Sequence, residues 1–139
     1  MFLLDTNVLS ALINPTPPVS VLRWIAEQNY QELFTASVCQ AELLAGLAIM
    51  PQGQRRHRLE RAAERIFDDD FDGQILAFDA AAAEVYAHIF AGRRRMGRPM
   101  PTLDLMIAAT AMAHSAEIVT RNVSDFEGCG VVVINPWDE

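Results

Sequence analysis

Four acidic residues follow or adjoin predicted breaks in secondary structure, and together they could bind a cation. Asp5 follows the apolar residues 2–4, and Glu42 lies in the first two turns of a helix predicted after a second strand. Asp104 lies in the first turn of a later helix, and Asp125 lies in the loop after a further strand. Carboxylates held together repel one another and lose hydration, so such a cluster is stable when a hard cation lies between them.

The residue types favour magnesium chemistry. Mg²⁺ prefers oxygen ligands and retains several waters, and two such ions about 3.5–4 Å apart can activate water and stabilise the leaving oxygen in phosphodiester cleavage. We expect no histidine or cysteine beside the acids, which makes zinc an unsuitable ion. The sequence contains no lysine, and this excludes P-loop phosphate binding, Schiff-base chemistry and a receiver-domain phosphorelay.

The elements that must position these acids alternate along the chain. Short apolar runs predict strands at residues 2–4, 32–37, 74–78, 117–120 and 131–134, and helical patterns predict helices at residues 8–13, 19–28, 38–50, 54–67, 80–95 and 103–115. Such alternation is typical of a three-layer α/β domain with a parallel sheet of about five strands flanked by helices. We expect Ser37, Asp79 and Thr102 to cap the helices that follow them.

The carboxyl ends of parallel strands share one edge of the sheet, where ligands bind in open α/β folds. Asp5, Glu42 and Asp125 follow strands and are therefore expected at this edge. Asp104 precedes its strand, so its helix must begin near the same edge by tertiary packing. Three of the four acids also have a structural alternative: Asp5 could cap the first helix, Asp104 could favour a helix dipole, and Asp125 could be a turn residue.

Composition limits the possible classes of protein. The chain has 139 residues, of which 51% are hydrophobic, and a net charge of −7, which predicts one domain over residues 1–139 and disfavours disorder. No apolar run approaches the roughly 18 residues of a membrane helix, and the N-terminus lacks a basic region typical of a signal peptide. Cys39 and Cys129 have no metal-like spacing, so we interpret them as reduced thiols of a cytoplasmic protein.

The arginines form two groups that could contact RNA despite the negative net charge. On helix 54–67, acidic residues are interleaved with the arginines, which favours a solvated, salt-bridged helix. The second group surrounds Gly97 and could bind RNA or complement the end of helix 80–95. The first group contains Arg55, Arg56, Arg58, Arg61 and Arg65, of which the last three share one helical face with Glu60 and Glu64 interleaved, and the second contains Arg93, Arg94, Arg95 and Arg98.

Four motifs occur in order along the chain. The first is LDTNVL at residues 4–9, and the second is AEL at residues 41–43 with Gly46. The third is DLMIAATA at residues 104–111, and the last combines VTRN at residues 119–122 with DF at 125–126 and the ending INPW at 134–137. In these motifs, and over nearly its whole length, the sequence resembles the PIN-domain ribonucleases, most closely the VapC/FitB-type toxins of bacterial type II toxin–antitoxin pairs.

The resemblance implies a metal-dependent endoribonuclease in a single PIN domain. Its catalytic metal ligands would be Asp5, Glu42 and Asp104, with magnesium or manganese as cofactor. Some relatives place a further acid where this chain has Asn122, and others place it where this chain has Asp125, so either position could complete the site and Asp125 is the candidate. The residues implied to orient ligands or water are Thr6, Asn7, Thr120 and Asn122.

The resemblance also implies partners. They are an RNA substrate such as tRNA or another structured RNA, a VapB/FitA-like antitoxin, and a second copy of the chain in a homodimer. No association with a membrane is expected. Apolar residues early in the chain could supply the dimer interface, namely Trp24, Ile25, Leu43 and Leu47.

Two other functions are compatible with parts of the sequence. The neutral Asn122 suggests, as an alternative, a catalytically weak PIN module that mainly binds RNA or a protein partner. A haloacid-dehalogenase-like phosphatase also begins with a strand and an aspartate, but it requires a second acid where Asn7 stands and a lysine, which is absent.

Overall fold

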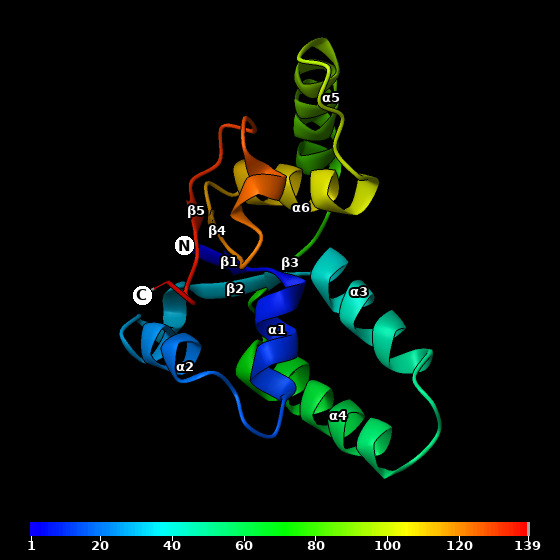
Figure 1. The fold of residues 1–139 in the computed structure, drawn as a ribbon. Helices are drawn as coiled ribbons and strands as arrows, with labels where there is room; N and C mark the ends of the chain where they lie inside the picture. The colour runs from blue at the N-terminus through cyan, green and yellow to red at the C-terminus, as the bar shows by residue number, and fades with distance from the viewer. Residues whose placement is uncertain (139) are drawn as a thin grey trace.

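The computed structural model describes residues 1–138, whose centre is a five-stranded parallel sheet between layers of helices (Figure 1). The sheet order is β3-β2-β1-β4-β5, and every neighbouring pair is parallel. This arrangement confirms the predicted three-layer α/β class. The strands are β1 (Phe2–Leu4), β2 (Leu33–Ala36), β3 (Ile75–Leu76), β4 (Glu117–Val119) and β5 (Val133–Ile134).

The helices occupy both faces of the sheet. In Figure 1, α5 and α6 lie on one side of it, α1, α2 and α4 lie on the other, and α3 extends beside α1 and α4. Within residues 1–138, no helix is long and apolar enough to cross a membrane. The helices are α1 (Thr6–Ile13), α2 (Val19–Ala26), α3 (Ser37–Ala48), α4 (Gln54–Arg65), α5 (Ala80–Arg95) and α6 (Thr102–Ala113), with short turns η1 (Tyr30–Glu32), η2 (Ile66–Asp70, a π turn) and η3 (Val123–Phe126).

The strand order reverses at the centre of the sheet. After β1 the chain adds β2 and β3 on one side, then returns to add β4 and β5 on the other. Leu3 of β1 is therefore paired with Phe34 of β2 and with Ile118 of β4. The crevice outside the carboxyl ends of β1 and β4 is a topological switch point, the usual ligand site of an open α/β sheet.

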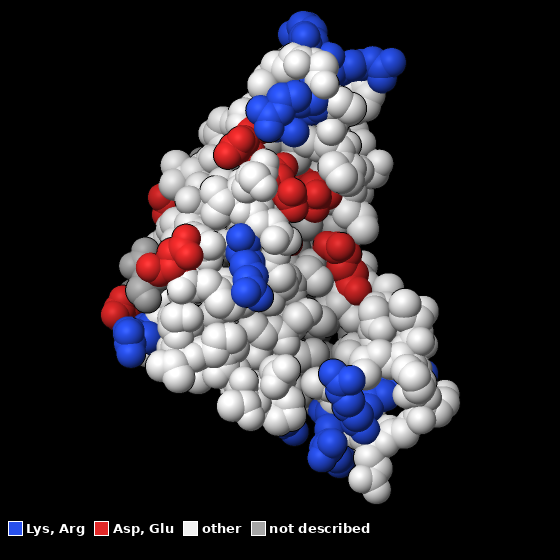
Figure 2. Space-filling view, in the orientation of Figure 1, with Lys and Arg blue, Asp and Glu red and all other residues white. Residues whose placement is uncertain are grey.

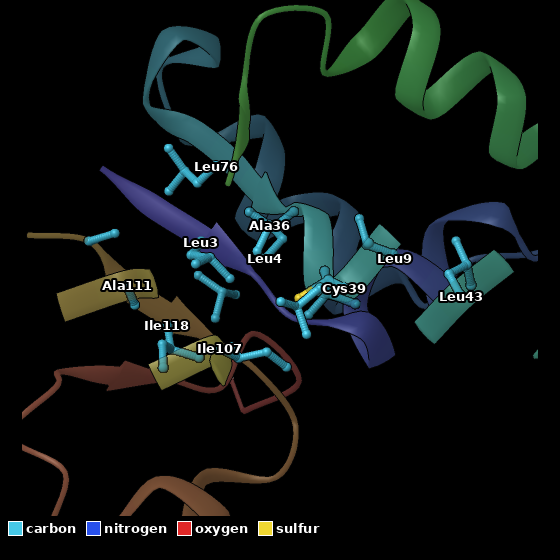
Figure 3. Close-up of a cluster of buried hydrophobic side chains, with 14 of the residues drawn as sticks. Leu3, Leu4, Leu9, Ala36, Cys39, Leu43, Leu76, Ile107, Ala111 and Ile118 are labelled. Atoms are coloured by element: carbon cyan, nitrogen blue, oxygen red, sulfur yellow. The ribbon is translucent and has the colours of Figure 1, made fainter. Parts of the chain in front are cut away.

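Helix α6 is fixed against β1 and β4 by an apolar core. Leu3, Ile107, Ala111 and Ile118 are fully buried and gather between these elements in Figure 3. The helix immediately precedes β4 and runs antiparallel to it, as connections between parallel strands require. Its first turn, which carries Asp104, consequently lies at the carboxyl edge of the sheet.

Several predicted boundaries shift in the structure. Asp79 caps α5 as predicted, with its carboxylate accepting from Ala82 N–H at 3.0 Å. Ser37 and Thr102 were predicted caps, and this was wrong: each is the first helical residue, after Ala36 and Pro101. Strand β3 contains two residues rather than five. Gln74, just before it, is still joined to β2: its backbone carbonyl accepts from Thr35 N–H at 3.1 Å, and its side-chain amide donates to the carbonyl oxygen of Leu33.

The proposed dimer-interface residues were mostly wrong. Trp24, Leu43 and Leu47 are each 5% exposed and belong to the protein's own core. Leu43 packs near Leu9 and Cys39 between α1 and α3 (Figure 3). Ile25 is half-buried against the same core. These side chains already contribute their apolar area to folding and are not free to form a second interface.

Candidate active site

Asp5 lies directly after β1, and its carboxylate accepts three hydrogen bonds from nitrogen and oxygen donors. Thr6 N–H donates to Oδ1 at 2.7 Å, which caps α1. Thr120 Oγ1 and Asn7 Nδ2 donate to Oδ2 at 2.8 and 3.3 Å. Capping is therefore part of the role of Asp5, but its second oxygen is held from the end of β4, across the switch point. Only 6% of the residue is exposed.

A network of polar groups fixes the Thr120 hydroxyl. Asn7 Nδ2 and the N–H of Asn122 donate to Thr120 Oγ1 at 3.0 and 3.1 Å. Because this oxygen accepts twice, its own proton is directed to Asp5. The amide of Asn7 is oriented in turn, since Arg121 N–H donates to its Oδ1 at 3.2 Å. The side chains of Thr120 and Asn7 hold Asp5, whereas Asn122 acts through its backbone.

Glu42 is linked to Asp5 through one residue. Its α3 helix begins at the carboxyl end of β2, which places the half-buried Glu42 in the second turn. Thr6 Oγ1 donates to Glu42 Oε1 at 2.7 Å, while the N–H of Thr6 is bonded to Asp5. Thr6 thus sets the separation and orientation of the two carboxylates.

Asp104 and Asp125 are near enough to Asp5 and Glu42 for these charges to affect one another. Asp104 is half-buried, Asp125 is exposed on η3, and within residues 1–138 no hydrogen-bond donor contacts the carboxylate of either. Burial raises the pKa of Asp104 to about 6, and the charges of Asp125, Asp5 and Glu42 act in the same direction. Burial also raises the pKa of Asp5 against the opposing hydrogen bonds from Thr120 and Thr6, and Glu42 and Asp125 add to the rise.

The carboxylates surround the crevice without forming a preassembled cage. In the part of the chain that the structure describes, no three acidic, histidine or cysteine side chains are close enough together to hold a metal ion. The residues nevertheless suit a hard cation, because the carboxylate set supplies only oxygen and the mutual repulsion recorded in the raised pKa values would be offset by positive charge.

Cys39 lies beside the site, contrary to our expectation that no cysteine would. Its Sγ is 3.9 Å from Asp5 Oδ1. Burial and the neighbouring Asp5 raise the pKa of the thiol, so it stays protonated and donates to the carboxylate. A protonated thiol is a poor metal ligand, and the preference of the site for oxygen ligands stands.

Arg93 does not belong to an exposed RNA-contacting group, and that expectation was wrong for this residue. It is 7% exposed, its Nε donates to the carbonyl oxygen of Arg98 at 2.7 Å, and its Nη1 donates to that of Glu127. It therefore joins the loop before α6 to the segment after η3, the two segments beside Asp104 and Asp125. Its partners are backbone carbonyls, which leave no signal in a sequence.

A groove that sequence reasoning missed opens next to the carboxylates. Its volume is about 740 Å³, and α1, α3 and α4 form its walls. Thr6 and Glu42 line it together with arginines of α4. Figure 2 shows basic side chains gathered over α4 and at the far end of α5, with acidic side chains between them. The α4 arginines that line the groove are Arg55, Arg58, Arg61 and Arg65.

Carboxylates at the switch point of a parallel α/β sheet, beside a basic groove, suit the hydrolysis of phosphodiesters, and the relatives of the chain include named nucleases. The PIN domain family model matches residues 2–127. The chain is 39% identical over 138 residues to VapC ribonuclease Y4jK of Sinorhizobium fredii, with 99% of each chain covered. It is 34% identical over 139 residues to Toxin FitB of Neisseria gonorrhoeae, with 100% of each covered.

A solved structure gives the same assignment. FitAB bound to an IR36 DNA fragment matches with a TM-score of 0.90 at 34% identity, over 99% of this chain and 96% of that one. This chain belongs to the PIN-domain family, among the VapC/FitB ribonucleases of toxin–antitoxin systems. The resemblance inferred from its four motifs is confirmed.

Proposed function

We propose that this protein is a magnesium- or manganese-dependent endoribonuclease and the toxin of a type II toxin–antitoxin pair. The observation that carries the proposal is the grouping of four carboxylates at the carboxyl edge of the sheet, where burial and the charges of the other three raise the pKa of Asp104. The oxygen-only chemistry of this set supports a hard divalent cation, and the ribonuclease named among its relatives supports RNA as the substrate.

In this proposal the cation is held by Asp5, Glu42 and Asp104, and Asp125 completes the set. When bound, the cation activates water for attack on phosphorus and stabilises the charge that develops on the phosphate oxygens. The other residues of the chain orient the ligands. Thr120 and Asn7 fix the Oδ2 atom of Asp5, and Thr6 fixes Glu42, so less conformational entropy is lost when the cation binds.

Cleavage of a labelled structured RNA tests the proposal. The wild type should cleave with Mg²⁺ or Mn²⁺ and should be inactive in EDTA. Asp5→Asn and Asp104→Asn should each reduce the rate by about 100-fold or more, since ligand loss exceeds the effect of losing an orienting group. Asp69→Asn, an exposed acid of η2, is the matched control. Full activity in either ligand variant would refute the mechanism.

The same assay addresses the alternative of an RNA-binding module without catalysis, which the neutral Asn122 suggested. Isothermal titration with Mn²⁺ measures whether the carboxylates bind metal at all. RNA binding by the wild type that needs no metal and leads to no cleavage would favour the module. Metal binding that is lost in Asp104→Asn, together with metal-dependent cleavage, would favour the enzyme.

The proposed biology includes an inhibitor and a structured RNA such as tRNA. A VapB/FitA-like antitoxin would bind a homodimer of this chain and block the crevice, and an arginine of the antitoxin would face the carboxylates. FitAB, which superposes on this chain, is the supporting likeness. Expression of the protein should be toxic to cells, and co-expression of a small neighbouring gene should relieve the toxicity. Toxicity that no neighbouring gene relieves would contradict this role.

A further inference from the structure

The groove beside α4 begins at the candidate active site. Thr6 and Glu42 line its inner end, and Arg58, Arg61 and Arg65 line the wall that α4 supplies. Thr6 is hydrogen-bonded both to Glu42 and to Asp5. A polymer bound with one of its phosphates at the carboxylates can therefore continue directly into this groove.

The wall of α4 carries positive charge that the protein does not neutralise. Within residues 1–138, the one ion pair on this helix joins Arg56 to Glu60 at 3.3 Å, and Arg58, Arg61 and Arg65 have no acidic partner. Glu60 and Glu64, whose spacing favoured a salt-bridged helix, do not line the groove. The three arginines are solvated as predicted, but the expected salt bridges do not form, because the arginines project from a different face of α4.

The other group of arginines is largely engaged. Arg93 is buried against backbone carbonyls, and Arg98 lies 3.6 Å from the carboxylate of Glu127. The guanidinium of Arg94 lies over the ring of Phe90, 5.9 Å from its centroid. Within the described residues, α4 thus carries more exposed, unpaired guanidinium groups than the segment around Gly97 does. The α4 groups also border the carboxylates.

We propose that Arg58, Arg61 and Arg65 bind successive backbone phosphates of the RNA substrate as it leaves the active site. The inference rests on the proposed function. Guanidinium groups bind phosphate in a bidentate manner, and positions 58 and 65 lie about 10 Å apart along a helix axis. Phosphate contacts position a nucleic acid without reading its sequence, so these residues set affinity and register rather than base preference.

The charge pattern favours RNA over a protein segment. The floor of the groove is aliphatic, with Ile13, Leu47 and Leu59, and would accept a ribose or base face or an apolar helix. The basic wall, however, continues from the position where a phosphate must be bound for cleavage. With a cation at the carboxylates, a polyanion satisfies both ends of the groove at once, whereas an apolar helix leaves the guanidinium groups without partners.

Fluorescence anisotropy with a labelled RNA hairpin tests the inference. The hairpin carries a single-stranded flank of about ten nucleotides, and binding is measured in EDTA so that no cleavage is expected. Arg58→Gln, Arg61→Gln and Arg65→Gln should each weaken binding about 3- to 10-fold. The triple variant should reduce the slope of log affinity against log salt by about 2, since each single-strand phosphate contact contributes about 0.7. Arg23→Gln, exposed on α2, is the matched control.

The outcomes separate this inference from the proposed function. If the wild type cleaves RNA with Mg²⁺ but the α4 variants bind and cleave as Arg23→Gln does, the inference is overturned and the function stands. If the α4 variants keep full RNA binding but no longer bind the inhibitory protein of the neighbouring gene, the groove is a protein site and the inference is also overturned. If the wild type neither binds nor cleaves RNA, both fail. Circular dichroism melting confirms that each variant folds.

Discussion

Replacing Asp104 by asparagine should stabilise the metal-free protein while abolishing its activity. Burial and three neighbouring carboxylates raise the pKa of Asp104 from its ordinary value of 3.8 to about 6. A carboxyl group whose pKa is higher in the folded state binds its proton more tightly there than in the unfolded chain. Its ionisation therefore destabilises the fold, and the penalty develops as pH rises from about 4 to about 6.

The magnitude follows from the pKa. Each pKa unit corresponds to about 1.4 kcal/mol, so the rise gives an upper limit of about 3 kcal/mol at neutral pH. Asp104 is only half-buried, and solvent screening reduces the effect of such a group, so we expect about 1 kcal/mol. Asp104→Asn should raise the free energy of unfolding by this amount at about pH 7.5, and the melting temperature by roughly 3–5 °C for a chain of this size.

Urea unfolding in EDTA, at about pH 7.5 and about pH 5, measures how the free energy of unfolding of the wild type and of Asp104→Asn changes with pH. The wild type should gain stability at the lower pH relative to Asp104→Asn, and the difference between the two should shrink. Adding Mg²⁺ at neutral pH should reverse the order, because a ligand bound only by the folded wild type stabilises it. A variant that is less stable than the wild type in EDTA at neutral pH would refute the electrostatic reasoning.

Three further predictions concern the groups that build the site, and urea unfolding measures each. Ile118→Ala removes a fully buried side chain of β4 and should cost about 2–5 kcal/mol; a cost below about 1 kcal/mol would show that the core is loosely packed. Thr120→Val removes the shorter of the two hydrogen bonds to Asp5 Oδ2 and leaves the N–H of Asn122 without its partner, so it should cost about 1–3 kcal/mol and lower the cleavage rate; an unchanged rate would argue against an orienting role. Arg93→Met removes the two donors with which a buried guanidinium holds the backbone carbonyls of Arg98 and Glu127 and should cost about 2–4 kcal/mol, while Arg23→Met should be neutral.

Much of the fold could be predicted because its signals are local. The apolar residues 2–4 ending at Asp5 identified the central strand, and Asp79 identified the start of α5. Ser37 and Thr102 were misassigned as caps, because an N-cap and a first helical residue have similar preferences. Strand β3 was overestimated, since an apolar run does not reveal how many of its residues find a hydrogen-bonding neighbour.

The candidate site was partly predictable for a different reason. Asp5 was placed at the sheet edge by the strand before it, but Asp104 depended on the direction in which α6 packs, which is a tertiary property. The clamp made by Arg93 and the groove beside α4 depended on contacts between segments far apart in the chain. The sequence of α4 shows that arginines and glutamates are interleaved, but it does not show which face of the helix borders the carboxylates.

The tight packing of α6 has a consequence for how this protein can vary. Five consecutive residues of the helix, 107–111, are buried, so the helix cannot rotate or slide on the sheet. Inserting one residue between Asp104 and this segment would turn the carboxylate by about 100° and shift it by about 1.5 Å along the axis. Length changes should therefore not be tolerated within the first turns of α6, which act as a fixed spacer between the core and the carboxyl edge of the sheet.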